Sequence, residues 1–388
     1  MENDELKLVI VHRKLKIIKP NFATKKIFIM KYFIISVLCL FGLWVSAQEC
    51  NSHEQLKTLP GKWLPQPGDE VAASSPRPSA ADAAGAKTVF NRIGKMLQQE
   101  YKPVGVDVYN YLTHSITPGS PYGNSYIYTI SNFRFLCING KKTKNDEGVS
   151  SSVTINPVRT SGNIQFLEMK VYDESGKLNT ETDGTGGFYS LSIKQCKGGK
   201  LPDFSNGYHS FEGGNNYNVW VTYEGKMPYR YVSRKEFLEK QVAIGEANLK
   251  DLNKHYSSKG WKDNLEMFPQ YKEKMLEDKK KHLAMFEKPL EAYRQDLKKD
   301  TAWLHEMAVV KQESVSGVYR YVFTTVDDPY MRAVPIMPNP GYYNRKLPKW
   351  APQFMIITVG RTDSFIGENI RKVVDENIEY FKSILTNQ

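Results

Sequence analysis

The chain has 388 residues, a net charge of +11 and an aromatic content of 12%, with 23 tyrosines. This aromatic content is enough to bury a sizeable core, which excludes a largely disordered chain. The positive charge is spread thinly and lacks the clustered basic face of a nucleic-acid-binding domain, so no nucleic-acid partner is expected.

The first fifty residues carry the pattern of an export signal. An apolar run from Tyr32 to Val45 ends in the small residues Ser46 and Ala47. Three lysines precede it, namely Lys25, Lys26 and Lys31. A basic region, an apolar stretch and small residues, in this order, predict a secretory signal peptide. We therefore expect the protein to be periplasmic, displayed on the cell surface or secreted.

Met30 opens a signal of ordinary length, so we interpret 30–47 as the signal peptide and 1–29 as an upstream extension of the reading frame. An uncleaved anchor over 27–47 is the alternative. A spanning helix needs about 20 apolar residues, and Lys31 interrupts this stretch. Cleavage after Ala47 is favoured, and membrane contact is expected only through the signal segment.

Cleavage after Ala47 changes the charge and the cysteine count. Eight of the 53 basic and three of the 42 acidic side chains lie in 1–47, which leaves 45 and 39 and a net charge of +6. Three cysteines remain. Cys137 and Cys196 lie in strand-like surroundings, so we predict a disulfide between them and leave Cys50 unpaired. Metal-ligand spacing is absent around these cysteines, so no zinc site or other cofactor is expected.

The next regions indicate a linker and then a sheet. Residues 48–86 are rich in Pro, Ser, Ala and Gly and are interpreted as a flexible linker. Apolar residues at steps of three and four predict a helix over 87–100. Short runs rich in Tyr, Val, Ile and Phe, separated by Asn-Gly and Asp-Gly turns, predict antiparallel strands up to 233. These strands are 126–130, 133–138, 166–172, 189–193 and 218–223.

A helical hairpin is predicted over 234–312. Ser233 and Glu236 have the spacing of a capping box at a helix start. Four leucines then recur at intervals of seven residues: Leu276, Leu283, Leu290 and Leu297. This repeat predicts two antiparallel helices with coiled-coil packing, and Pro289 is expected to kink or restart the second helix.

The last region, 313–388, returns to strands and ends in a helix. Strands are predicted at 318–325 and 354–359, with a proline-rich stretch between them, and a final helix at 367–385. The expected fold class is α+β: an antiparallel sheet (87–233) with a packed N-terminal helix, an inserted helical hairpin (234–312) and a C-terminal strand and helix segment on the sheet.

Familiar catalytic and nucleotide-binding motifs are absent from the sequence. His209 and Glu212 stand three residues apart in a Gly- and Asn-rich region and are the weak candidates for proton transfer. Four carboxylates crowd a second turn region and are weak candidates for calcium ligands. They are Asp173, Glu174, Glu181 and Asp183.

Two further groups suggest binding rather than catalysis. Tyr342, Tyr343 and Trp350 share the proline-rich segment and are candidates for lining a groove for peptide or glycan. The favoured role of these residues is to clamp a long loop onto the core. The basic run 279–282 is preceded by acidic residues, so it is expected to form a solvated face or to bind anionic polymers or lipid headgroups.

Three short segments carry a family resemblance: Pro228-Tyr229-Arg230-Tyr231-Val232-Ser233-Arg234-Lys235-Glu236-Phe237-Leu238, Asn339-Pro340-Gly341-Tyr342-Tyr343 and Leu347-Pro348-Lys349-Trp350-Ala351-Pro352-Gln353-Phe354. With them, the chain resembles a group of uncharacterised exported proteins of Bacteroidota. The resemblance implies a cell-envelope setting and brings no activity and no functional residue with it.

The resulting expectation is a non-enzymatic exported protein that binds an envelope protein or a glycan. The alternative is a hydrolase acting on envelope or extracellular polymers. An exposed apolar or aromatic patch would favour the binding protein, whereas titratable groups gathered in a concave pocket would favour the hydrolase.

Overall fold

The computed structural model describes residues 50–64, 77–115, 123–144, 148–157, 165–166, 171–172, 178–179, 188–192, 196, 200–213, 215–315, 318–331 and 333–386. The predicted upstream extension (1–29) and signal peptide (30–47) lie outside these residues. Within the described part of the chain, no helix is both long enough and apolar enough to cross a membrane. The chain divides into two units, one comprising Met1–Leu56 with Leu136–Thr143 and the other comprising Lys57–Phe135 with Lys144–Gln388.

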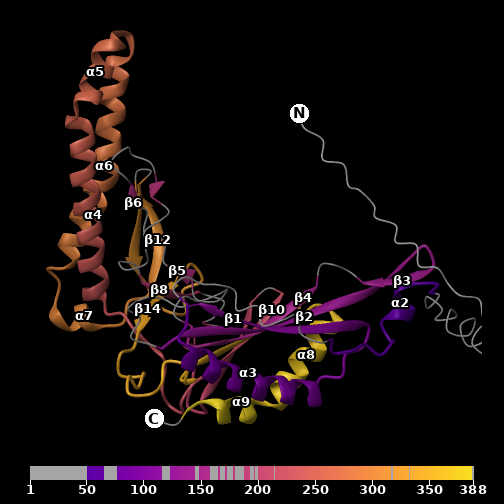
Figure 1. The fold of residues 1–388 in the computed structure, drawn as a ribbon. Helices are drawn as coiled ribbons and strands as arrows, with labels where there is room; N and C mark the ends of the chain where they lie inside the picture. The colour runs from indigo at the N-terminus through magenta and orange to yellow at the C-terminus, as the bar shows by residue number, and fades with distance from the viewer. Residues whose placement is uncertain are drawn as a thin grey trace, which may run out of the picture. The chain divides into compact units, whose positions relative to one another are not determined.

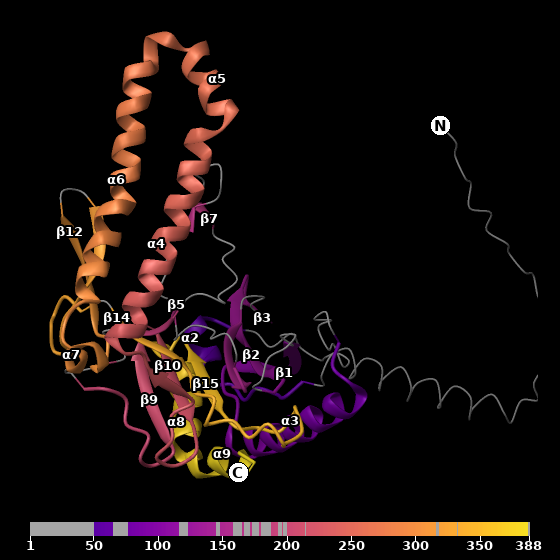
Figure 2. The ribbon, with the colours of Figure 1, turned by 90° about the vertical axis from the view of Figure 1, so that its left-hand side faces the viewer.

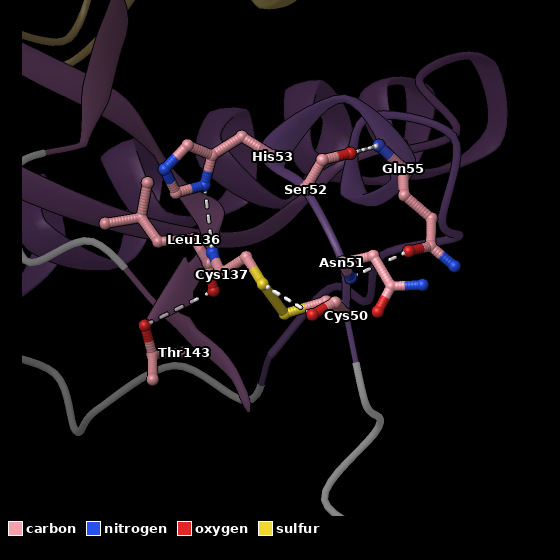
Figure 3. Close-up of a disulfide and its surroundings, with 8 residues drawn as sticks. All are labelled: Cys50, Asn51, Ser52, His53, Gln55, Leu136, Cys137 and Thr143. Atoms are coloured by element: carbon pink, nitrogen blue, oxygen red, sulfur yellow. Dashed lines mark hydrogen bonds between the residues drawn. A yellow bond between two sulfur atoms is a disulfide. The ribbon is translucent and has the colours of Figure 1, made fainter. Parts of the chain in front are cut away.

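The smaller unit is held by a disulfide between Cys50 and Cys137, whose Cα atoms are 5.8 Å apart (Figure 3). The backbone nitrogen of Cys137 donates to Nδ1 of His53 over 3.0 Å, and that of Cys50 donates to the carbonyl of Gly140 over 3.1 Å. His53 opens the short helix α2 (His53–Leu56).

The predicted Cys137–Cys196 disulfide is therefore wrong. Cys50 lies at the start of the predicted flexible linker, but its segment is bonded to the turn that follows Cys137. Cys196 is a free thiol with 1% of its surface exposed. Burial raises the pKa of this thiol to about 11, because the thiolate would lose its hydration.

The larger unit contains an antiparallel sheet with the strand order β1-β2-β4-β15-β10-β9. The strands in this order are β1 (Val106–Ser115), β2 (Ser125–Ile138), β4 (Val149–Ile155), β9 (Tyr208–Gly213), β10 (Asn216–Val221) and β15 (Met355–Gly360), and a seventh strand, β3 (Lys141–Lys144), pairs with β2. The C-terminal strand β15 lies between β4 and β10 and pairs with both. The C-terminal region thus contributes a strand to the middle of the sheet, and the two helices that follow this strand pack on the sheet.

Three helices cover one face of this sheet: α3 (Ala80–Glu100), α8 (Phe365–Glu376) and α9 (Ile378–Ile384) (Figure 1). Their apolar sides and the inward side chains of the sheet form the largest core of the molecule. The Ser79 hydroxyl accepts from the nitrogen of Asp82 and caps α3. The predicted final helix is divided into α8 and α9 at Asn377, whose backbone leaves the helical conformation.

The predicted linker 48–86 differs from the structure at both ends. Helix α3 starts at Ala80 rather than at residue 87, because the alanine-rich stretch is itself helical once Ser79 caps it. Near the start of the same unit, Pro60 and Trp63 form bridges to Val104 and Val108. The proline and glycine content predicted a flexible linker. In the structure, these backbone bridges order part of the segment.

A second antiparallel sheet has the order β13-β12-β14-β8-β5, with β11 beside β14. Its strands are β5 (Gln165–Phe166), β8 (Tyr189–Ser192), β11 (Tyr229–Tyr231), β12 (Val310–Val315), β13 (Val318–Phe323) and β14 (Ala333–Pro338); β6 (Val171–Tyr172) and β7 (Leu178–Asn179) pair separately. The two large sheets share a core around Trp220 of β10, whose ring contacts Phe211, Tyr229 and Phe354.

The helical hairpin connects β11 to β12. It consists of α4 (Arg234–Ser257), α5 (Lys259–Met267), a 3-10 turn (Pro269–Tyr271), α6 (Lys272–Asp296) and the short α7 (Thr301–His305). Figure 2 shows α4 and α6 side by side with α5 at the far end. The capping box of Ser233 and Glu236 is confirmed. The fold is α+β, as predicted.

The two long helices of the hairpin run antiparallel. Gly245 packs against Leu290, Glu246 forms an ion pair with Arg294, and Tyr256 reaches His282. Residues 245 and 246 of α4 thus meet residues 290 and 294 of α6, whereas Tyr256, ten residues further along α4, meets the earlier residue His282. Pro289 lies inside α6, which continues as one helix through it.

Candidate functional site

The proposed proton-transfer pair is not brought together. His209 and Glu212 both lie on β9, but an odd spacing on a strand places their side chains on opposite faces. The His209 ring contacts Phe211 at 4.7 Å, and its Nδ1 lies 3.1 Å from the carbonyl oxygen of Asp203. Burial lowers the pKa of this imidazole. The pair therefore forms no acid–base site.

Glu212 has a structural contact on the other face of the sheet. Its carboxylate forms an ion pair of 2.9 Å with Arg371 of α8. The Arg371 guanidinium lies 4.3 Å from the centre of the Tyr217 ring. These contacts hold a helix against the edge of the sheet, and they explain Glu212 without a catalytic role.

The tyrosines proposed to line a groove belong to the core. Tyr342 has 1% and Tyr343 has 8% of its surface exposed. The Tyr342 hydroxyl donates to the carbonyl of Gln353 and accepts from the nitrogen of Tyr223. Trp350 is half-buried against the main core. The groove prediction is thus wrong for the tyrosines, because the proline-rich segment turns them inward to clamp it onto the sheets.

The four proposed calcium ligands, Asp173, Glu174, Glu181 and Asp183, lie outside the described residues. Among the residues that are described, no three His, Cys, Asp or Glu side chains gather in a way that could hold a metal ion.

The strongest candidate for an interaction site is the far end of the hairpin. Met267, Phe268 and Tyr271 have 66%, 42% and 56% of their surfaces exposed, and Leu276 one turn further has 42%. We call these four residues the apex patch. They lie on α5, the 3-10 turn and the start of α6, and no residue of α5 is buried. Large apolar side chains grouped in solvent are typical of interaction surfaces.

Aromatic contacts directly beneath the apex patch hold the turn in place. The rings of Tyr256 and Trp261 meet at 4.8 Å, edge to face. The Tyr256 hydroxyl is 2.8 Å from Nδ1 of His282, which links α4 to α6. The Lys279 ammonium lies 5.3 Å from the centre of the same Tyr256 ring. The apex patch therefore stands on a preformed support.

Charges of both signs surround the apex patch. The exposed charged side chains between 259 and 274 are Lys259, Lys262, Lys272 and Lys274 together with Asp263, Glu266 and Glu273. An apolar centre with a mixed polar rim is the usual composition of a protein–protein interface.

Sequence reasoning predicted the hairpin but not the apex patch. A usable signal was present, because Met267, Phe268 and Tyr271 stand in a connection between helices, where polar turn residues are expected. Apolar residues at that position have no core to join unless a partner supplies one.

Comparison with known proteins adds no assignment to this geometry: no protein-family model, no curated protein and no solved structure matches the chain.

Proposed function

We propose that the chain is a non-enzymatic exported protein that docks a partner protein of the cell envelope through the apex patch of its helical hairpin. The exposure of Met267, Phe268 and Tyr271 on a supported turn carries this proposal. Methionine and aromatic side chains are enriched in the centres of protein interfaces, because they bury a large area and adapt to a partner surface.

The charges around the patch favour a protein over a lipid surface. A helix end that binds anionic lipid is rich in Lys and Arg on its polar side. Here four lysines stand among three carboxylates between residues 259 and 274, which suits the mixed charges of a folded partner. A glycan partner would need flat aromatic faces with hydrogen-bonding groups beside them, whereas two of the four patch residues are Met267 and Leu276.

The setting of the proposal is the cell envelope. The signal-like segment 25–47 and the resemblance to exported proteins of Bacteroidota both support it. The Cys50–Cys137 disulfide fits the same setting, because such bonds persist in oxidising compartments. We also propose that α4 and α6 pack as an antiparallel coiled coil along the leucine repeat.

Photo-crosslinking in the native cells tests this function. A photoreactive amino acid replaces Phe268 at the apex patch or, in the control, the exposed Lys288 lower on α6. We expect one discrete protein adduct from position 268 and none from position 288. A single chance contact could also give an adduct. Met267→Ser and Tyr271→Ser are therefore introduced together with the photoreactive residue, and these two substitutions should abolish the adduct.

Three outcomes would contradict the proposal. The first is an equal adduct from both positions, and the second is an adduct that survives the two substitutions. The third is binding of the purified protein to vesicles of anionic lipid that depends on Phe268, which would assign the apex patch to the membrane surface instead.

A further inference from the structure

A pocket of about 510 Å³ lies at the base of the hairpin, at the opposite end from the apex patch. The start of α4, the end of α6, helix α7 and strands β12 and β13 form its walls. The residues that line it are Arg234, Asp296, Lys299, Trp303, Lys311, Glu313, Arg320, Val322, Phe323, Thr324 and Thr325. Its volume falls within the range of about 300–1,000 Å³ that is typical of small-molecule sites.

Arg234 and Trp303 form a fixed wall of this pocket. The Arg234 guanidinium lies 4.7 Å from the centre of the Trp303 ring and 5.5 Å from that of Phe323. It forms an ion pair of 2.9 Å with Glu306, and only 13% of the Arg234 side chain is exposed. Its Nε is buried and has no hydrogen-bond partner in the described structure. Stacking and pairing together leave this cation with little freedom to move.

The other cations of the pocket are held less firmly. Lys299 lies 4.2 Å from the centre of the Trp303 ring and pairs with Asp296, with half of its side chain exposed. Lys311 reaches Asp328 at 3.3 Å and Glu313 only at 3.8 Å. Arg320, the partner of Glu313 in the strand register, has no ion pair with any described residue. An exposed pair such as Lys299–Asp296 contributes little and exchanges partners easily, whereas the side chains of Lys311 and Asp328 are mostly covered.

The lining has an excess of positive charge. Of the described residues that form it, four are cationic and two are carboxylates. Glu306 and Asp328, which pair with Arg234 and Lys311, are not among the lining residues. Two threonines bring the polar members to eight of eleven. A lining of this kind suits a ligand that carries hydroxyl groups and at least one negative charge.

We propose that this pocket binds an acidic sugar, that is, a small hydroxylated molecule bearing a carboxylate or a phosphate group. Arg320 offers the planar set of donors that pairs with either oxyanion in two parallel hydrogen bonds. Lys299 supplies a second positive charge to the lining, and the hydroxyl groups of Thr324 and Thr325 also line the pocket. The site is separate from the apex patch, so its failure leaves the proposed function untouched.

Titration calorimetry on the full purified protein tests the site. The probes are glucuronic acid for a carboxylate, glucose 6-phosphate for a phosphate, and glucose as the neutral control. We expect saturable binding of at least one acid, no binding of glucose, and weaker binding as salt is raised. The acid that binds more tightly identifies the oxyanion. No saturable binding of either acid, or equal binding of glucose, would overturn the proposal.

Four variants locate the binding. Arg320→Gln and Lys299→Gln are each expected to weaken the acid about tenfold or more, because a hydrogen bond to a charged group contributes on that scale. Arg294→Gln is the matched control: it removes a positive charge from α6, where Arg294 pairs with Glu246 outside the pocket. Glu313→Gln removes a competing carboxylate and should tighten binding.

Unchanged affinity in both Arg320→Gln and Lys299→Gln, or an equal loss in Arg294→Gln, would show that the acid binds elsewhere or through net charge alone. Thermal unfolding of each variant separates a binding defect from a folding defect. Lys299 is half exposed, so at least this substitution is expected to leave the fold intact.

Discussion

The two ends of the helical hairpin carry the same leucine repeat and have opposite environments. At the base, Leu290 has 3% of its surface exposed and packs against Gly245. Near the apex, Leu276, two repeats earlier, has 42% exposed. A heptad repeat therefore specifies the helices, whereas neighbouring elements decide which of its members are buried.

The base is buried because other elements meet it there. Leu238, Tyr293 and Leu304 form a cluster that joins α4, α6 and α7. The backbone nitrogen of Tyr321 on β13 donates to the Tyr293 hydroxyl over 2.9 Å. The apex receives no such contacts from the described part of the chain. We interpret the base as the part that secures the hairpin and the apex as the part that is free to bind.

The sharpest test of this comparison removes a leucine from each end. Leu290→Ala is expected to lower the free energy of unfolding by about 2–5 kcal/mol, because it leaves a cavity between α4 and α6. Leu276→Ala, at an exposed position, should change it by less than about 0.5 kcal/mol. Urea unfolding measures both. Equal losses would mean that the two ends are packed alike.

Two glycines of the hairpin, one beside Leu290 and one near the apex, give the next largest difference in stability. A Cβ atom at Gly245 would stand 3.2 Å from Cδ1 of Leu290, whereas one at Gly260 would meet no atom within 4 Å. Gly245→Val should therefore cost about 1–3 kcal/mol through overpacking, and Gly260→Val about 0.5 kcal/mol or less. The same unfolding measurement applies, and a loss at Gly260 as large as that at Gly245 would refute the contrast.

Contacts at the start of α4 make a smaller, pH-dependent contribution to the free energy of unfolding. Arg230 donates to Glu236 at 2.6 Å, and this contact together with the Ser233 cap lowers the pKa of Glu236 from 4.5 to about 2. The folded state therefore favours the ionised carboxylate. Its contribution is fully present above pH 4.5 and is lost as the pH falls towards 2.

Glu236→Gln tests this contribution. It is expected to lower stability at neutral pH by about 0.5–1 kcal/mol, a value reduced by solvent screening because more than a third of the side chain is exposed. The difference from the wild type should shrink as the pH is lowered from 4.5 to 2. Glu239→Gln, in an exposed pair with Lys235, is the control and should lower stability at neutral pH much less than Glu236→Gln.

The contrast between local and distant contacts also explains what the sequence could predict. The hairpin and the capping box depend on residues close in the chain, and both were predicted. The insertion of β15 between β4 and β10 joins segments some 140 and 200 residues apart in sequence order. No local pattern encodes such pairing, so β15 was recognised as a strand but not placed in the sheet.

The same limit applies to the sites. The Cys50–Cys137 pair depends on a turn that meets the start of the described chain, and hydrophobic patterns say nothing about that meeting. The pocket at the base draws Arg234, Lys299 and Arg320 from segments that only the tertiary fold brings together. His209 and Glu212 failed for a local reason, because their spacing on a strand separates the two side chains.

The smallest effect on stability is expected at the apex, where the effect on binding should be largest. Phe268→Ser removes an aromatic ring that is 42% exposed and that packs in no buried cluster. The free energy of unfolding should change by less than about 0.5 kcal/mol. In a pull-down of the partner identified by crosslinking, the same variant should retain little of that partner, because aromatic residues at the centre of an interface carry much of its binding energy.

Met285→Ser is the matched control, since Met285 is 47% exposed on α6 but lies away from the turn. Normal capture by Phe268→Ser, or equal loss by Met285→Ser, would show that the exposed apex is not the docking surface.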